Sequence, residues 1–142
     1  MKKTVSIVLC LVIVLSLTGC FVSPEKRVMN YYNKHITEFK DNIACHFEKG
    51  APLSFPARGV IVTEWVGAHT IVEYIVEGTG FAPSSRYYGF FYSRDNIPVS
   101  FQNSGEEMVS KSDIEWEWHG VGDNRGYVKQ IEPYWFYFEA SF

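Results

Sequence analysis

The sequence predicts an α+β domain with one N-terminal amphipathic helix packed on an antiparallel sheet of five or six strands. Two observations predict this class. Apolar residues recur at helical spacing up to Gly50, and from Gly59 onward the chain consists of short β-branched and aromatic runs separated by turn residues. No repeat or linker interrupts residues 23–142, so we expect a single domain. Its sheet is either flat, with one wet face, or strongly curved around the helix.

The chain begins with a hydrophobic leader. Lys2 and Lys3 precede an almost unbroken apolar run over residues 5–17, and small residues follow it. This order is typical of a secretory signal peptide. A membrane-spanning helix is the alternative, because residues 4–22 are about as long as a minimal span. The polar segment that starts at Ser23 favours the signal peptide.

Residues 17–20, Leu-Thr-Gly-Cys, resemble the lipobox of bacterial lipoproteins. The resemblance implies that residues 1–19 are cleaved and that the sulfur of Cys20 carries a diacylglyceryl group with chains such as palmitate. Residues 20–22 would then form the lipidated anchor and a short tether, and residues 23–142 the domain. Two acyl chains hold a protein stably on a membrane. We therefore expect a lipid-anchored protein on the extracytoplasmic face of the cell membrane.

Three segments of the body support the same resemblance: SSRYYGFFYSRDNIP, GDNRG and YFEASF. They are similar to segments of small uncharacterised lipoproteins of Gram-positive bacteria. That similarity implies an extracytoplasmic location and a small single domain, and it implies no activity.

The helix is expected from Ser23-Pro24-Glu25, a good capping sequence, to Gly50, a left-handed stop. The apolar stripe of this helix consists of Val28, Tyr32, Ile36, Phe39, Ile43 and Phe47. Three residues reach about 10 Å, so a domain tethered through Cys20 should lie against the bilayer. The basic side chains expected near the lipid headgroups are those of Lys26, Arg27 and Lys34.

The strands follow in order. Residues 60–66 and 70–77 form a hairpin, in which Val72, Tyr74 and Val76 alternate with Glu73 and Glu77. We then expect a loop at 78–85, an aromatic strand at 86–94, a short strand or loop at 99–112, a strand at 113–119, a loop at 120–126, and a last hairpin at 127–131 and 134–141. Residues 134–138 are apolar on both faces, which places their strand in the middle of the sheet.

Charge and cysteine content exclude some classes. Loss of the leader would change the formal charge from −3 to −5, and a mildly acidic domain has no electrostatic footprint for nucleic acid. Cys45 would be the one cysteine left beside the lipidated Cys20, so no intramolecular disulfide can form, and we expect an inert thiol. The four histidines do not converge, and no HExxH or CxxC occurs, so we expect no metal and no cofactor.

Weak catalytic candidates share one strand face. Glu115 and Glu117 would lie about 7 Å apart, with His119 beyond them. Paired carboxylates can serve as acid and base in sugar hydrolysis. The same alternation is typical of a solvent-facing strand whose glutamates pair across to residues such as Lys129.

Aromatic residues make up 17% of the chain, and all lie after the leader. They form either a core rich in rings or an exposed face that binds a partner. Candidates for such a face are Tyr87, Phe91, Trp116, Trp118 and Trp135.

Our leading hypothesis is therefore a membrane-anchored, non-enzymatic module that binds a protein or an envelope component. The alternative is a small-ligand carrier or sensor with a pocket between helix and curved sheet. A hydrolase that uses Glu115, Glu117 and His119 is the third hypothesis. The sequence does not indicate an oligomeric state.

Overall fold

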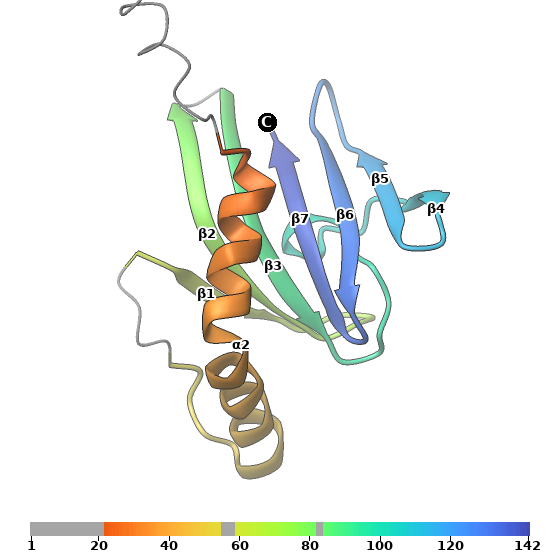
Figure 1. The fold of residues 1–142 in the computed structure, drawn as a ribbon. Coiled ribbons are helices and arrows are strands. Elements are labelled where there is room, and N and C mark those ends of the chain that lie inside the picture. The colour runs from red at the N-terminus through yellow and green to blue at the C-terminus, as the bar shows by residue number, and fades with distance from the viewer. Residues whose placement is uncertain (1–21, 55–58, 82–83) are drawn as a thin grey trace, which may run out of the picture.

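The structure is a computed structural model that describes residues 22–54, 59–81 and 84–142 (Figure 1). The leader, the lipobox and Cys20 lie outside the described residues. The elements are α2 (Pro24–Lys49), β1 (Ile61–Trp65), β2 (Ile71–Phe81), β3 (Ser84–Ser93), the short 3-10 helix η1 (Phe101–Asn103), β4 (Val109–Ser112), β5 (Glu115–His119), β6 (Arg125–Glu132) and β7 (Trp135–Ser141). One helix on an antiparallel sheet confirms the α+β class.

The predicted ends of α2 are confirmed. The Ser23 hydroxyl accepts a hydrogen bond from the backbone N–H of Lys26 at 3.3 Å, and Pro24 occupies the first turn. At the other end Gly50 has φ of 66° and its N–H donates to the His46 carbonyl at 3.0 Å. A left-handed residue at this position closes the helix, and glycine adopts it without steric cost. No helix within the described ranges is long and apolar enough to span a membrane.

The finer prediction of an N-terminal amphipathic helix is wrong. The apolar contacts of the helix are not confined to one stripe. Of the six predicted stripe residues, Ile36 and Phe47 are only half-buried. Met29 and Tyr31, outside the stripe, also pack against the core, so the apolar contacts spread around the helix. The buried residues of α2 are Val28, Tyr32, Phe39 and Ile43.

The sheet has seven strands, not five or six, in the order β1-β2-β3-β7-β6-β5-β4, and each neighbouring pair is antiparallel. The additional strand is β4 at one edge. All four of its residues are exposed, so it has no apolar alternation by which a strand could be recognised. Of the segment predicted as a loop at 78–85, residues 78–81 instead prolong β2 and residues 84–85 begin β3, with Gly78 opposite Tyr87. Residues 82–83 lie outside the described residues.

The topology consists of two meanders joined at the centre. β1, β2 and β3 form the first, β4 to β7 form the second, and β3 pairs with β7. The prediction that the strand at 134–138 lies in the middle of the sheet is confirmed. Residues 94–108 connect β3 to the distant edge strand β4. This connection buries Val99 and Phe101 on the sheet face opposite the helix.

Each face of the sheet therefore has its own core. Under α2, Phe39 contacts Phe90 and Tyr74 with ring centroids 4.7 Å and 4.9 Å apart. Apolar rings at such distances favour tilted and edge-on packing. The far core, on the opposite face, consists of Ile71, Phe91, Val99, Phe101, Trp118, Val128, Phe136, Phe138 and Ala140.

Candidate functional site

The helix-side face of the sheet becomes polar toward one end. In β7, Trp135 and Tyr137 are buried under the helix, whereas Glu139, two residues further along the same face, is half-buried. In β3 the same face changes from the buried ring of Phe90 to the exposed side chain of Arg86. Because α2 begins at Pro24, this end of the face projects beyond the helix (Figure 1). We call it the open half; its residues are Arg86, Tyr88, Glu117, His119, Arg125, Tyr127 and Glu139.

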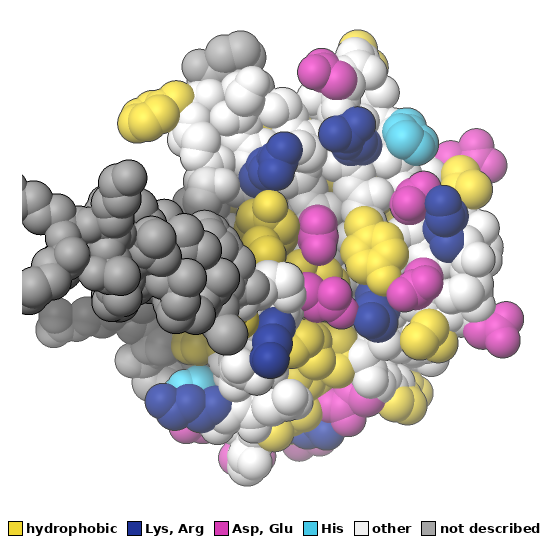
Figure 2. Space-filling model, turned by 45° about the horizontal axis from the view of Figure 1, so that its top comes forward, with side chains coloured by type: hydrophobic (Ala, Val, Ile, Leu, Met, Phe, Trp, Pro, Cys, Tyr) yellow, Lys and Arg dark blue, Asp and Glu magenta, His cyan; other side chains and the backbone are white. Residues whose placement is uncertain are grey.

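The open half is hollowed. The seven residues line a depression of about 340 Å³ together with Gly126, Ala140 and Ser141. Figure 2 looks toward this end of the molecule and shows basic, acidic and apolar side chains close together on one surface. Ligand sites are concave and combine apolar walls with a few polar groups. The shape and the lining fit a small polar ligand.

Strand pairing arranges these residues in two rows. In the outer row, Arg86 of β3 and Arg125 of β6 lie on either side of Ser141 in β7, and His119 lies opposite Arg125. Adjacent strands are about 5 Å apart, so the two arginine Cα atoms are about 10 Å apart. Arg86, Arg125 and His119 are exposed, and no described residue forms an ion pair with them.

The inner row carries acids and tyrosines. Glu117, Tyr127, Glu139 and Tyr88 are paired in that order from β5 through β6 and β7 to β3, and Glu77 of β2 completes the row. Glu77 is already paired, because Arg27 of α2 donates to both of its carboxylate oxygens at 2.7 Å and 2.8 Å. This pair also holds the pKa of Glu77 below its usual value. The pair marks the border between α2 and the open half.

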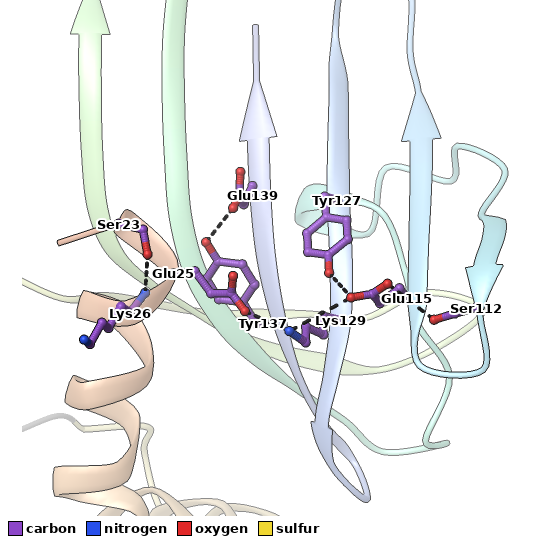
Figure 3. Close-up of polar contacts among 9 residues, drawn as sticks. All are labelled: Ser23, Glu25, Lys26, Ser112, Glu115, Tyr127, Lys129, Tyr137 and Glu139. Carbon is purple, nitrogen blue, oxygen red and sulfur yellow. Dashed lines mark hydrogen bonds and ion pairs between the residues drawn. The ribbon is translucent and has the colours of Figure 1, made fainter. Parts of the chain in front are cut away.

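A second border contact joins the helix to β6 and β5 (Figure 3). Lys129 Nζ lies 3.0 Å from Glu25 in the first turn of α2 and 4.0 Å from Glu115. The Tyr127 hydroxyl donates to Glu115 at 2.6 Å. Burial and this hydrogen bond raise the pKa of Tyr127, so the phenol stays protonated and acts as a donor.

Tyr137 lies in the row below and is tied to the inner row in the same way. The Tyr137 hydroxyl donates to Glu139 at 2.9 Å, and burial followed by this bond raises the pKa of Tyr137 (Figure 3). A phenol with a raised pKa is a poor general base. Tyr127 and Tyr137 therefore orient carboxylates, which remain acceptors for hydrogen bonds from outside.

The structure places Glu115, Glu117 and His119 on the open side of β5. The predicted pairing of Glu115 with Lys129 across the strands is confirmed. Glu115 also accepts from Tyr127, and Glu117 lies 3.2 Å from Lys111. Both carboxylates are thus held by donors of the chain.

The aromatic candidates lie elsewhere. Phe91, Trp118 and Trp135 are at most 3% exposed and belong to the two cores. Tyr87 and Trp116 are half-buried on the far face. Rings in these positions stabilise the fold, so we do not base the binding surface on them.

Sequence reasoning missed Arg86, Tyr88, Arg125, Tyr127 and Glu139. A signal for them exists in the alternate positions of three strands. Each series changes from apolar to polar, and strand pairing brings the polar ends together: 90, 88, 86 in β3; 131, 129, 127, 125 in β6; and 135, 137, 139, 141 in β7.

On the far face a buried carboxylate fastens the 94–108 connection. Glu73 is 1% exposed, and it accepts hydrogen bonds from the Gln102 backbone N–H at 3.0 Å and from Trp65 Nε1 at 3.4 Å. Burial raises the pKa of Glu73 to about 7. Gln102 itself has φ of 56°, so this contact holds a strained backbone in place.

Within the described ranges, no three His, Cys, Asp or Glu side chains are grouped so that they could hold a metal ion. Cys45 has a free, half-buried thiol.

Comparison of the chain with models of protein families, with curated proteins and with solved structures finds no match.

Proposed function

We propose that the chain is a lipid-anchored binding module on the extracytoplasmic face of the cell membrane, and that its open half binds an anionic sugar unit of the cell envelope. The lipobox supports the anchor at Cys20. The binding proposal depends on Arg86 and Arg125. Neither forms an ion pair with a described residue, and both lie above a hollow lined by tyrosines and carboxylates.

The chemistry of the two rows matches the two parts of such a ligand. Guanidinium groups bind carboxylate or phosphate through paired, charge-assisted hydrogen bonds, so the anionic group would lie between Arg86 and Arg125 over Ser141. The carboxylates of Glu117 and Glu139 accept hydrogen bonds from sugar hydroxyls. The half-buried rings of Tyr88 and Tyr127 offer flat apolar surface with a polar edge.

The two other hypotheses have less support. A carrier needs space between helix and sheet, and that space is filled by rings: Tyr32 lies 5.0 Å from Phe90 and 5.5 Å from Trp135 between ring centroids. No comparable observation favours a hydrolase. The contacts of Glu115 with Tyr127 and Lys129, and of Glu117 with Lys111, are those expected on a solvent-facing strand.

Calorimetric titration of the full chain tests the binding proposal. The probes are glucuronate and glucose 1-phosphate, with glucose as the uncharged control. We expect both anionic sugars to bind more tightly than glucose, and we expect R86Q and R125Q each to weaken binding about 10-fold, the effect of losing one charge-assisted hydrogen bond of about 1.4 kcal/mol.

K34Q is the matched control for charge removal, because Lys34 is an exposed helix residue outside the open half. It should leave the affinity unchanged. Equal affinity for glucose and the anionic sugars, or equal loss in K34Q and R125Q, would contradict the proposal. The anchor is tested separately by intact mass analysis of protein purified from its own membrane, which should show a chain that begins at a diacylglyceryl Cys20.

A further inference from the structure

Two apolar side chains project into solvent at the open end of the sheet. Phe81 and Val121 are 92% and 93% exposed, more than any other large apolar side chain among the described residues. Phe81 is the last residue of β2, and Val121 lies in the turn between β5 and β6. Neither side chain belongs to either of the two cores that the described residues form.

Strand pairing places both residues at the same end. Phe81 lies opposite Ser84, and Ser85 is joined to Phe142 by two backbone hydrogen bonds of 3.0 Å and 2.9 Å. The β5–β6 turn closes there too, where the Gly120 N–H donates to Asn124. Figure 1 shows the ends of β2, β5 and β7 and the starts of β3 and β6 on one side of the molecule.

The helix also begins at this end. Arg27 is bonded to Glu77 of β2 and to the carbonyl of Val22, which fixes the start of α2 beside β2. Glu77 and Phe81 are four residues apart, which is about 13 Å along a strand. Arg27 and Ser23 are four residues apart, which is about 6 Å along a helix. Because helix and strand run side by side, Phe81 reaches about 7 Å beyond Ser23.

The tether is only slightly longer than this difference. Three residues from Cys20 to Ser23 extend to about 10 Å at most. A bilayer that holds the acyl chains on Cys20 would therefore lie at the height of the Phe81 and Val121 side chains. The exposed basic residues at this end are Lys26, Arg86 and Arg125, and the exposed acidic residue in the β5–β6 turn is Asp123. The carboxylates of Glu117 and Glu139 at this end are half-buried, so the three exposed basic side chains are the charged groups best placed to contact anionic lipid headgroups.

We propose that the open end of the sheet is a membrane-docking surface: Phe81 and Val121 insert between the headgroups of an anionic bilayer, and Lys26, Arg86 and Arg125 lie at its surface. The proposal rests on the anchor at Cys20 given above, and it specifies which end of the domain meets the membrane. The open half then faces the zone next to the headgroups, and the β1–β2 turn points away from the bilayer.

Tryptophan reporters in the full, membrane-extracted chain test this orientation. F81W and V121W place a reporter at the proposed surface, and V66W is the matched control, since Val66 is 79% exposed in the β1–β2 turn at the opposite end of β2. Each variant is reconstituted into phosphatidylcholine vesicles containing phosphatidylglycerol, with and without lipids brominated near the headgroup. The fluorescence of the wild-type chain is subtracted.

We expect brominated lipid to quench the added fluorescence of F81W and V121W several-fold more than that of V66W. Protein that sediments with the vesicles but shows equal quenching at positions 66, 81 and 121 would overturn the docking surface and leave the anchor intact. Protein that does not sediment with the vesicles, or that sediments equally well as C20S, would overturn the anchor and the docking surface that depends on it.

Discussion

The two halves of the helix-side face use the same strands for opposite purposes. In the covered half, Phe90 and Tyr137 are buried against α2; two residues further along the same strands, Tyr88 and Glu139 line an open hollow. The strand alternation is identical in both halves. What separates them is the residue at which the helix begins. A single covering element thus divides one sheet face into a core and an open, hollowed surface.

The largest expected effect distinguishes the covered half. Phe39 is fully buried and contacts the rings of Tyr74 and Phe90, so F39A should lower the free energy of unfolding by about 3–5 kcal/mol. R125A in the open half should change it by no more than about 0.5 kcal/mol. Urea denaturation of both variants measures the difference. Comparable losses would show that the open half is part of the stabilising core.

The pH dependence of stability compares the buried carboxylate of Glu73 with the carboxylate of Glu139 in the open half. Glu73 is buried and its pKa is raised to about 7 from 4.5, so its folded form binds the proton more tightly than the unfolded form. The contribution of protonated Glu73 to the free energy of unfolding is complete below pH 4.5 and is lost as the pH rises through 7. The change in that free energy is about 3 kcal/mol.

E73Q removes this titration and keeps one acceptor for the bond from Gln102. The difference in unfolding free energy between E73Q and the wild-type chain should therefore change by about 3 kcal/mol in favour of E73Q from pH 4.5 to pH 8. E139Q, from the open half, is the control. The difference in unfolding free energy between E139Q and the wild-type chain should change much less over the same pH range. A pH-independent difference for E73Q would refute the buried-carboxylate account.

Gly126 tests whether the open half has a packed core behind it. A Cβ at this position would lie 2.2 Å from Trp118 Nε1, because the buried indole of Trp118 lies over the glycine on the far face. G126A should cost about 1–3 kcal/mol through this overlap. G78A is a gentler control, since its Cβ would be 3.3 Å from Tyr87. Thermal melts that rank G78A as the more damaging change would contradict this packing.

The smallest effect is expected at the border of the two halves. Lys129 links Glu25 of the helix to Glu115 of β5 but is partly exposed, so K129M should cost less than about 1 kcal/mol at low salt. The loss should shrink further at 1 M salt, because screening weakens partly exposed ion pairs. Chemical denaturation at two salt concentrations measures it. A loss of several kcal/mol that does not depend on salt would make this contact a core interaction.

The sequence predicted the parts of the fold that local patterns determine. Ser23 and Gly50 fix the ends of the helix through capping, and the two-sided apolar run at 134–138 places its strand at the centre. The edge strand β4 lies in the segment at 99–112, for which the sequence left a short strand or a loop open, because its four exposed residues show no alternation.

Long-range pairing explains the rest of what was missed. Glu73 alternates with apolar neighbours like a residue on a wet face, yet it is buried because residues 94–108 cover that face. The candidate site was only partly predictable for the same reason. Arg86 and Arg125 are 39 positions apart in the chain. They lie on either side of Ser141 only because β3 and β6 both pair with β7.

Native mass spectrometry of the chain purified from its own membrane tests the central claim, that the open half is the binding surface, most directly. The wild-type protein should carry a non-covalent anionic sugar species, and a double variant R86Q R125Q should lose it while K34Q retains it. A wild-type chain without such a species, or a double variant that keeps it, would contradict the account.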